Sequence, residues 1–330
     1  MIGSKTITPE TSDITVSKPG WFSPERILEY AMVGVLIVLI IAATAIYPGF
    51  LDPGNLQIVL TQYAPLGVVA VGMTLVIIAG GFDLSVGAIF ATAATIAAAL
   101  STEIGVTPAI FLALGAGIVL GAINAFGVTV LKVNPFITTL GTSSLYSGGV
   151  LFFTDSTAFS DTNEDFQWLG TGTLLGIPIT ILVLVLTFAV GVLALNFTSF
   201  GRSIYAIGGS REAARLSGIH VNLVQGSTYV ISGFLAALAG ILTASQQGAG
   251  QGSMGATVAL DAIAIVVIGG TSLVGGEGKL WRTAVGLSVL AILDNIFYSL
   301  AVDSNAQLIV KGAIVILAVA ADQLVKRRQR

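Results

Sequence analysis

The feature that most constrains this chain is a series of long stretches that carry no charged residue. A helix needs about 20 apolar residues to cross the roughly 30 Å hydrocarbon core of a bilayer, whereas a membrane β-barrel would show alternating segments of about ten residues. Most of the uncharged stretches are long enough for a helix, and they are continuous rather than alternating. The sequence therefore predicts an all-α, polytopic membrane helix bundle. The stretches without Asp, Glu, Lys or Arg are 30–51, 53–82, 84–102, 104–131, 133–154, 166–201 and 216–260.

The composition excludes several other classes of protein. Only 9% of the 330 residues are charged, against about 25% in a soluble domain, so a water-soluble globule is excluded. The chain has no cysteine and one histidine, so disulfides, thiolate metal sites and the HExxH zinc motif are impossible. The glycine stretch that ends at Gly278-Lys279 lacks the first Gly and the final Ser or Thr of a P-loop. We therefore expect no metal, no cofactor and no ATP site of this type in the chain.

The uncharged stretches can be divided into about ten transmembrane helices. They form a single membrane domain over residues 30–325, between a polar tail (1–29) and a basic C-terminus (326–330). The hydrophobic run that follows the tail lacks the small-residue cleavage site of a signal peptide, so we expect the first helix to be retained. The predicted helices cover roughly 30–48, 58–80, 84–101, 107–131, 134–153, 173–196, 222–245, 257–275, 283–302 and 306–324.

The distribution of charge predicts the orientation of the bundle. Of the 14 Lys and Arg residues, all except Lys311 fall in segments that lie on one side of the membrane if both termini lie there. The loops on the opposite side, including the long loop 154–172, contain Asp and Glu but no base. Because basic residues concentrate on the cytoplasmic side, we predict that both termini are cytoplasmic, together with the long loop 196–221.

Two glycine-rich segments share the spacing GGxxLxxG and stand where helices are predicted to end. They are Gly80–Gly87 and Gly269–Gly276. Glycine readily adopts the positive φ angles that a sharp reversal of the chain requires. We therefore predict chain reversals at the inner ends of two helices, with segment 81–83 at the cytoplasmic face.

The inner loop contains a short segment with helix-terminating signals. Ser210 is a suitable N-cap, Glu212 lies near the positive end of the helix dipole, and Gly218 can end the helix. Ala213 and Leu216 would form a small apolar face. Such a helix suits docking into a groove of another protein, although an ordinary basic inner loop would also explain the segment. The candidate residues are Arg211, Glu212, Ala213, Ala214, Arg215, Leu216 and Gly218.

Four motifs in order make the chain recognisable from about Asn55 to Leu324. The motifs are Gly80–Gly87, Asn134–Gly141, Gly201–Ile219 and Leu260–Gly276. With these motifs the sequence resembles the permease subunits of bacterial ABC sugar importers of the ribose, arabinose, xylose and galactose type. In this family, Glu212-Ala213-Ala214 and Gly218 are similar to the EAA loop that docks on the ATPase, although the I-x-LP element that ends the longer form of that loop is absent here.

The resemblance implies a function and a set of partners. It implies a type II importer fold, like the vitamin B12 permease, in the bacterial inner membrane. The chain would carry a sugar or sugar-like solute from a soluble binding protein to the cytoplasm by alternating access. It would act with a second permease copy or a sister permease and with two ATP-binding subunits, which hold the ATP and Mg. The lipid bilayer surrounds it, and no nucleic-acid partner is expected. The alternative is an ion- or proton-coupled secondary transporter or facilitator.

Three charged residues lie well inside the predicted spans, away from the span ends: Asp261, Asp294 and Lys311. A charge at the centre of a membrane helix costs about 2.5–3.5 kcal/mol on insertion scales and needs a partner. We therefore predict that Lys311 pairs with Asp261 or Asp294, either as a structural pair or in solute contact or gating.

A sugar path should present hydroxyl and amide groups with one or two aromatic rings. Each candidate for such a path could equally be a helix-packing residue. The candidates are Asn134, Phe136, Thr138, Thr139, Tyr146, Gln246 and Gln247.

Overall fold

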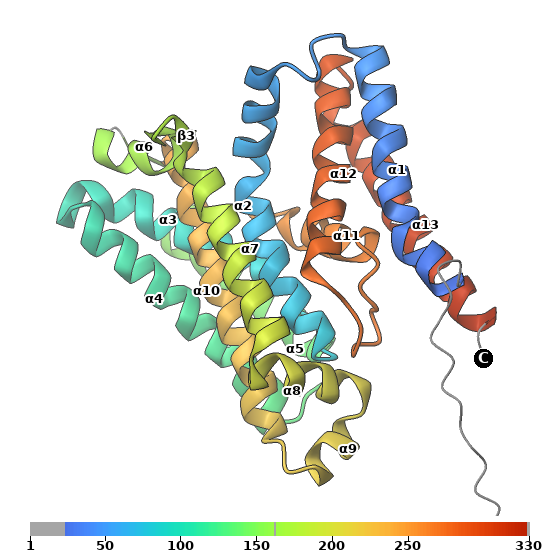
Figure 1. The fold of residues 1–330 in the computed structure, drawn as a ribbon. Helices are drawn as coiled ribbons and strands as arrows, with labels where there is room; N and C mark the ends of the chain where they lie inside the picture. Colours follow the sequence, from blue (N-terminus) through green and yellow to red (C-terminus); the bar gives the residue numbers. More distant parts are fainter. Residues whose placement is uncertain (1–23, 162, 329–330) are drawn as a thin grey trace, which may run out of the picture.

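The computed structural model describes residues 24–161 and 163–328 and is built mainly of long helices (Figure 1). Two short antiparallel strand pairs join parts of the loops: β1 (Phe159–Ser160) with β4 (Ala249–Gly250), and β2 (Thr173–Leu174) with β3 (Ile177–Pro178). The helices are α1 (Pro24–Ile46), α2 (Pro53–Ile78), α3 (Val86–Ile104), α4 (Val106–Ala125) with its π-helical continuation η1 (Phe126–Val130), α5 (Pro135–Phe153), α6 (Glu164–Thr171), α7 (Ile179–Phe197), α8 (Ser199–Gly209), α9 (Arg211–Leu216), α10 (Val221–Gln247), α11 (Val258–Ile268), α12 (Leu280–Ser299) and α13 (Ser304–Arg328).

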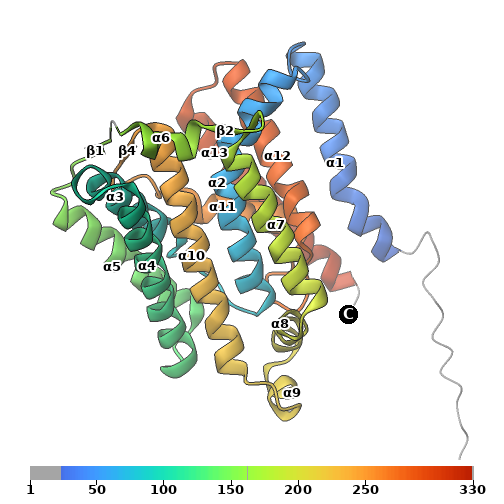
Figure 2. The same cartoon turned by 60° about the vertical axis from the view of Figure 1, so that its left-hand side comes forward.

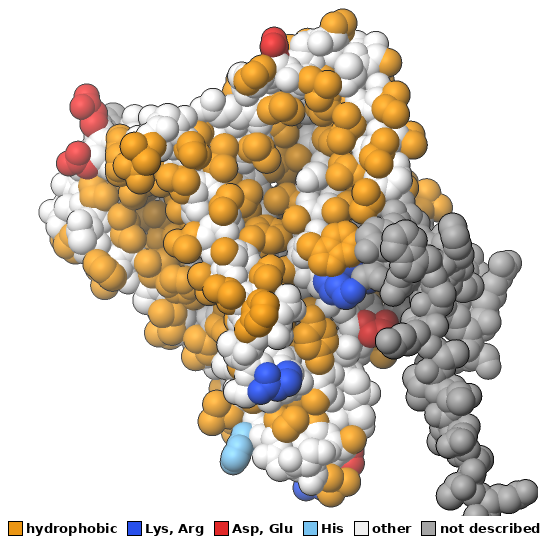
Figure 3. Space-filling model, viewed as in Figure 1, with side chains coloured by type: hydrophobic (Ala, Val, Ile, Leu, Met, Phe, Trp, Pro, Cys, Tyr) orange, Lys and Arg blue, Asp and Glu red, His pale blue; other side chains and the backbone are white. Residues whose placement is uncertain are grey.

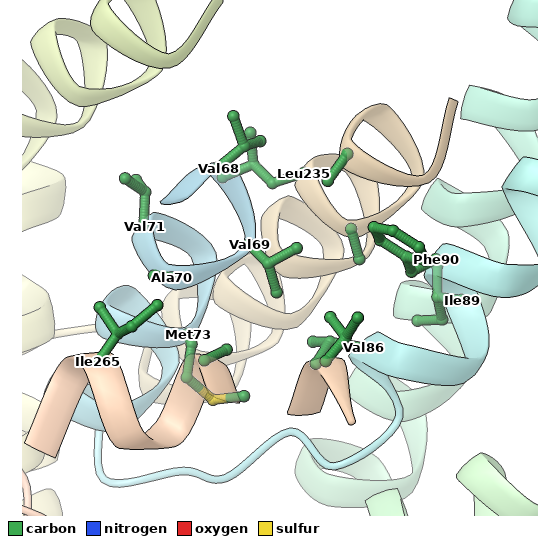
Figure 4. Close-up of a cluster of buried hydrophobic side chains, with 14 of the residues drawn as sticks. Val68, Val69, Ala70, Val71, Met73, Val86, Ile89, Phe90, Leu235 and Ile265 are labelled. Atoms are coloured by element: carbon green, nitrogen blue, oxygen red, sulfur yellow. The ribbon is translucent and has the colours of Figure 1, made fainter. Parts of the chain in front are cut away.

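Helix α10 lies at the centre of the bundle. It packs against α2, α3 and α4, while α2 also contacts α7, α11 and α12 (Figure 2). Where α2, α3, α10 and α11 meet, Val69, Met73, Phe90, Leu235 and Ile265 belong to one buried cluster (Figure 4). Helix α2 therefore joins the part of the bundle that contains α3, α4 and α10 to the part that contains α11 and α12.

The surface is that of a membrane protein. Hydrophobic side chains cover most of the described face in Figure 3, and its upper end carries acidic but no basic side chains. Among the described residues, six helices are long and apolar enough to cross a bilayer, and two shorter apolar helices, Met32–Ile46 and Val258–Ile268, accompany them. The predicted polytopic membrane helix bundle is thus confirmed. The six are α2, α3, α4 with η1, α7, α10 and α12.

Several predicted boundaries were wrong. Residues 173–178 form the β2–β3 hairpin, and α7 begins only at Ile179. The helix predicted for 257–275 ends at Ile268, so α11 is only about 16 Å long, well short of a bilayer core. Helix α1 begins at Pro24, before the predicted helix start at 30. Residues 1–23 of the predicted tail and 329–330 of the basic C-terminus lie outside the described residues.

Glycines let α4 and α10 approach closely, as packing inside a membrane requires. A Cβ atom on Gly117 would lie 2.6 Å from the carbonyl oxygen of Gly233, and one on Gly121 would lie 2.6 Å from that of Tyr229. The two helix backbones are therefore in direct contact.

Replacing Gly117 with leucine should destabilise the bundle by about 1–3 kcal/mol, because the added side chain would force these backbones apart. Thermal unfolding of the purified protein in detergent would measure the loss. Gly115→Leu is a matched control on the same helix, since a Cβ there meets no atom within 4 Å. Equal melting temperatures for the two variants would contradict the close contact.

Candidate functional site

The short helix predicted in the inner loop is present as α9. The hydroxyl of Ser210 accepts a hydrogen bond from the backbone N–H of Ala213 at 3.3 Å, which caps the helix start. Gly218 has φ of 83° and ends the segment in the left-handed region. Both predicted helix signals are confirmed, and Ala214 anchors the helix by packing against Ile207 and Val221.

The charged side chains of α9 point in different directions. Arg215 forms an exposed ion pair with Glu212 at 2.6 Å, and its hydrogen bonds lower the pKa of the Glu212 carboxyl. Arg211 instead donates to the side-chain oxygens of Gln225 at 2.6 Å and Asn222 at 3.0 Å. The two arginines are thus held apart, and each has neutral or acidic acceptors.

The opposite side of α9 is free of contacts with the bundle. Leu216 is 77% exposed, and Ala213 is also exposed. Beside the helix, a cavity of about 590 Å³ is lined by Lys132 and Asn134 of the α4–α5 connection, and by Arg211, Glu212 and Arg215. This end of the molecule therefore presents an exposed apolar side chain, Leu216, next to a cavity lined mainly by basic residues. Such a surface suits docking of an acidic or amphipathic partner.

The two glycine turns meet each other, and both meet the end of α8. Gly276 donates its backbone N–H to the carbonyl of Ile78 at 2.9 Å, and a Cβ atom on Gly275 would lie 2.8 Å from the Cα of Gly80. A Cβ atom on Gly208 would lie 2.9 Å from the Cα of Gly276. Positive φ angles at Gly80, Gly275 and Gly276 confirm the predicted reversals. We call these three contacting segments, 78–81, 207–209 and 275–278, the glycine junction.

Side chains connect α8 and α9 to this junction. Gln225, which holds Arg211, also donates to the carbonyl of Ala79 at 3.3 Å. Tyr205 of α8 donates its hydroxyl to the carbonyl of Gly278 at 2.7 Å. Helices α8 and α9 are therefore bonded to the α2–α3 turn and to the α11–α12 turn.

Asp83, in the turn between α2 and α3, is buried. It is 0% exposed, and its carboxylate accepts hydrogen bonds from the hydroxyls of Ser85 at 2.6 Å and Ser232 at 3.0 Å. Asn124 of α4 donates to Ser85 at 2.6 Å and accepts from Thr142 of α5 at 2.6 Å. This network ties the α2–α3 turn to α4, α5 and α10.

The predicted ion pair within the membrane segments is confirmed. Lys311 Nζ lies 2.6 Å from Asp294 Oδ2, and the hydroxyl of Tyr63 donates to the same oxygen. Asp261 does not form this pair but lines the same cavity. The structure therefore brings all three predicted charges together, from α11, α12 and α13.

The residues predicted to line a solute path are not gathered in one place. Asn134 caps α5, with Phe136 exposed and Thr138 and Thr139 in the first turns, where Thr139 donates to the carbonyl of Pro135 at 2.9 Å. Tyr146, two turns further, bonds to the carbonyl of Leu120 at 3.0 Å. Gln246 and Gln247 lie at the end of α10, where Gln246 donates to the carbonyl of Thr61 at 2.9 Å. Their role in transport stays a prediction.

With six described helices long and apolar enough to cross a bilayer, the chain belongs to the class of multi-pass membrane proteins. The family described as the branched-chain amino acid transport system / permease component matches residues 55–319, and the chain belongs to this family. No solved structure matches the chain.

Curated relatives cover nearly the whole chain. The ribose import permease of Haemophilus influenzae is 40% identical over 87% of this chain and 90% of its own length, and that of Bacillus subtilis is 42% identical over the same shares. The xylose transport system permease of Escherichia coli K12 is 32% identical over 97% of this chain and 98% of its own length. The resemblance read from the sequence motifs is confirmed.

Proposed function

We propose that this chain is the membrane-spanning permease subunit of an ATP-driven sugar importer, and that D-ribose is the first solute to test. The observation that carries the proposal is the identity of 37–42% with ribose import permeases over 87–93% of the chain. The family description also covers branched-chain amino acids, but this level of identity over nearly the full length favours a sugar. The same relatives do not favour an ion-coupled secondary transporter.

The proposed partners are two ATP-binding subunits, a soluble sugar-binding protein and a second permease, identical or sister. ATP and Mg are held by the ATP-binding subunits. Helix α9 docks on the ATP-binding subunits through Leu216 and Ala213. The cavity beside it, with Lys132, Arg211 and Arg215, binds an acidic segment of those subunits. The loop 154–172 at the other end faces the binding protein.

The proposed arrangement in the membrane is a type II importer fold, similar to the vitamin B12 permease. Both termini lie in the cytoplasm, and the membrane domain extends over residues 30–325. In this arrangement α1, α5, α11 and α13 add to the six long apolar helices to make ten membrane segments. Helix α11 enters only part of the bilayer, and the following glycine turn completes that segment.

Transport is driven through the glycine junction in this proposal. Closure of the ATP-binding subunits displaces α9, and the bonds from Arg211 to Gln225 and from Gln225 to Ala79 carry that displacement to the α2–α3 turn. The bond from Tyr205 to Gly278 carries it to the α11–α12 turn. Both turns precede helices of the bundle, so their movement changes access to the central path.

Reconstitution tests this function. The chain, purified with the ATP-binding and sugar-binding proteins that associate with it, is expected to take D-ribose into liposomes only when ATP is supplied to the ATP-binding side. Uptake by the chain alone, which collapses when an ion gradient is removed, would overturn the proposal in favour of the secondary transporter.

A further inference from the structure

A cavity of about 180 Å³ lies between α2, α11, α12 and α13. Asp294 is within about two turns of the end of α12, and Lys311 is within about two turns of the start of α13. The α12–α13 turn lies at the end of the bundle opposite α9 (Figure 1), so the cavity belongs to the half of the bundle away from the proposed ATPase side. The residues that line it are Gln62, Tyr63, Leu66, Asp261, Leu290, Asp294, Tyr298 and Lys311.

The ion pair in this cavity leaves an acceptor unused. Oxygen Oδ2 of Asp294 receives both Lys311 and the Tyr63 hydroxyl. The Asp294 side chain is only 8% exposed, yet its second oxygen, Oδ1, has no hydrogen-bond partner among the described residues. A buried acceptor without a partner costs about 1–3 kcal/mol, so such an atom calls for an explanation.

The charges around the cavity define what it can accept. Asp261 adds a second carboxylate, so two carboxylates and one ammonium group line the same space. A cation would find the Asp294 carboxylate already paired with the ammonium of Lys311, at 2.6 Å. An anion would meet two carboxylates. Hydroxyl groups suit the site better, because they donate to carboxylate oxygens and accept from an ammonium or an amide.

We propose that this cavity is a transient binding site for a neutral polyhydroxylated solute, whose hydroxyls donate to the carboxylates of Asp294 and Asp261. Lys311 and the Gln62 amide donate to the oxygens of the solute, and Tyr63 and Tyr298 lie beside it. Gln62 and Tyr298 are exposed and stand at the mouth of the cavity. The inference rests on the proposed function, because the cavity would be the first site in the helix bundle at which the transported sugar binds.

A purely structural ion pair makes a different prediction. A buried ion pair can often be replaced by apolar residues of similar volume without loss of stability. If the pair only holds α12 to α13, the double variant Asp294→Leu/Lys311→Met should still transport. If the cavity binds the solute, the double variant should assemble with its partners and yet fail to transport.

The test uses the complete importer in liposomes with D-ribose as the probe. Asp261→Asn leaves the ion pair in place and should raise the KM for uptake by about tenfold, the effect of one lost charge-assisted hydrogen bond. Asp303→Asn, an exposed change in the α12–α13 turn, should keep the wild-type KM. Unchanged KM values in both Asp261→Asn and the double variant would overturn the site.

A binding measurement separates this inference from the proposed function. Saturation-transfer NMR on the purified permease should detect D-ribose with the wild type and lose most of the signal with Asp261→Asn. Equal signals from the two proteins would overturn the cavity as a sugar site, whatever the uptake. Absence of ATP-driven uptake by the wild type would overturn the proposed function, while the NMR comparison would still decide the cavity.

Discussion

A single charge on the exposed face of α9 is expected to release the ATP-binding subunits and abolish uptake. Leu216 is 77% exposed and has charged neighbours on the same short helix. An apolar residue in that position can be buried only by a partner, and replacing it with aspartate would place an unpaired carboxylate in the interface. A central interface residue contributes about 2 kcal/mol or more, so association should weaken by roughly 30-fold or more. Co-purification of the ATP-binding subunits with Leu216→Asp would measure the change.

A control at the opposite end of the molecule shows whether the effect is local. Leu175 is 96% exposed in the β2–β3 hairpin, so Leu175→Asp introduces the same charge on an equally accessible leucine. This variant should retain the ATP-binding subunits at the wild-type ratio. Wild-type retention by Leu216→Asp as well would mean that α9 does not carry the docking surface.

The parts of this site that depend on short stretches of sequence could be predicted. Ser210 and Gly218 terminate α9 through contacts and angles within a few residues, so their chemistry is sufficient. The glycine turns follow in the same way from the angles that only glycine adopts easily. Local rules of this kind predict where a helix stops but not what its end will touch.

The contacts between distant segments could not be predicted in the same way. Gln225 holds Arg211 and also reaches Ala79, 146 positions away, and nothing in its neighbourhood marks it for that role. Helix α8 was missed because its few apolar residues, such as Ile204 and Ile207, are flanked by glycines and the segment was read as part of a loop. Asp83 accepts a hydrogen bond from Ser232, which lies 149 positions further on, and no local pattern indicates that bond.

The pairing of Lys311 with Asp294 is the exception, and its reason is energetic. A charge within a membrane span must find a partner. Asp261 was predicted to lie at a depth similar to that of Lys311, and Asp294 near the middle of its span, so these two were the candidates for the lysine. The need to pair a charge inside the bilayer therefore allowed this one tertiary contact to be predicted from the sequence. The same constraint did not identify the cavity beside the pair, because a cavity depends on how α2, α11, α12 and α13 pack together.

The second large effect is expected at the glycine junction. A single methyl group added at Gly208 should uncouple ATP hydrolysis from transport. A Cβ atom there would lie 2.9 Å from the Cα of Gly276 and closer still to the carbonyl oxygen of Ile78. Backbone atoms cannot move aside as a flexible side chain can, so α8 must shift away from both turns. Gly208→Ala should keep the ATP-binding subunits bound, because α9 itself is unchanged, but lower D-ribose uptake per ATP hydrolysed by about tenfold.

The adjacent glycine provides the matched control. A Cβ atom on Gly209 meets no atom within 4 Å, and its φ is not in the left-handed region. Both substitutions add one methyl group at the end of α8, and both remove the same backbone freedom from the unfolded chain. They differ only in what the methyl group touches. Uptake measured together with ATP hydrolysis in liposomes should therefore fall for Gly208→Ala and stay at the wild-type ratio for Gly209→Ala. An equal ratio in the two variants would show that displacement of α9 reaches the bundle by another route than the junction.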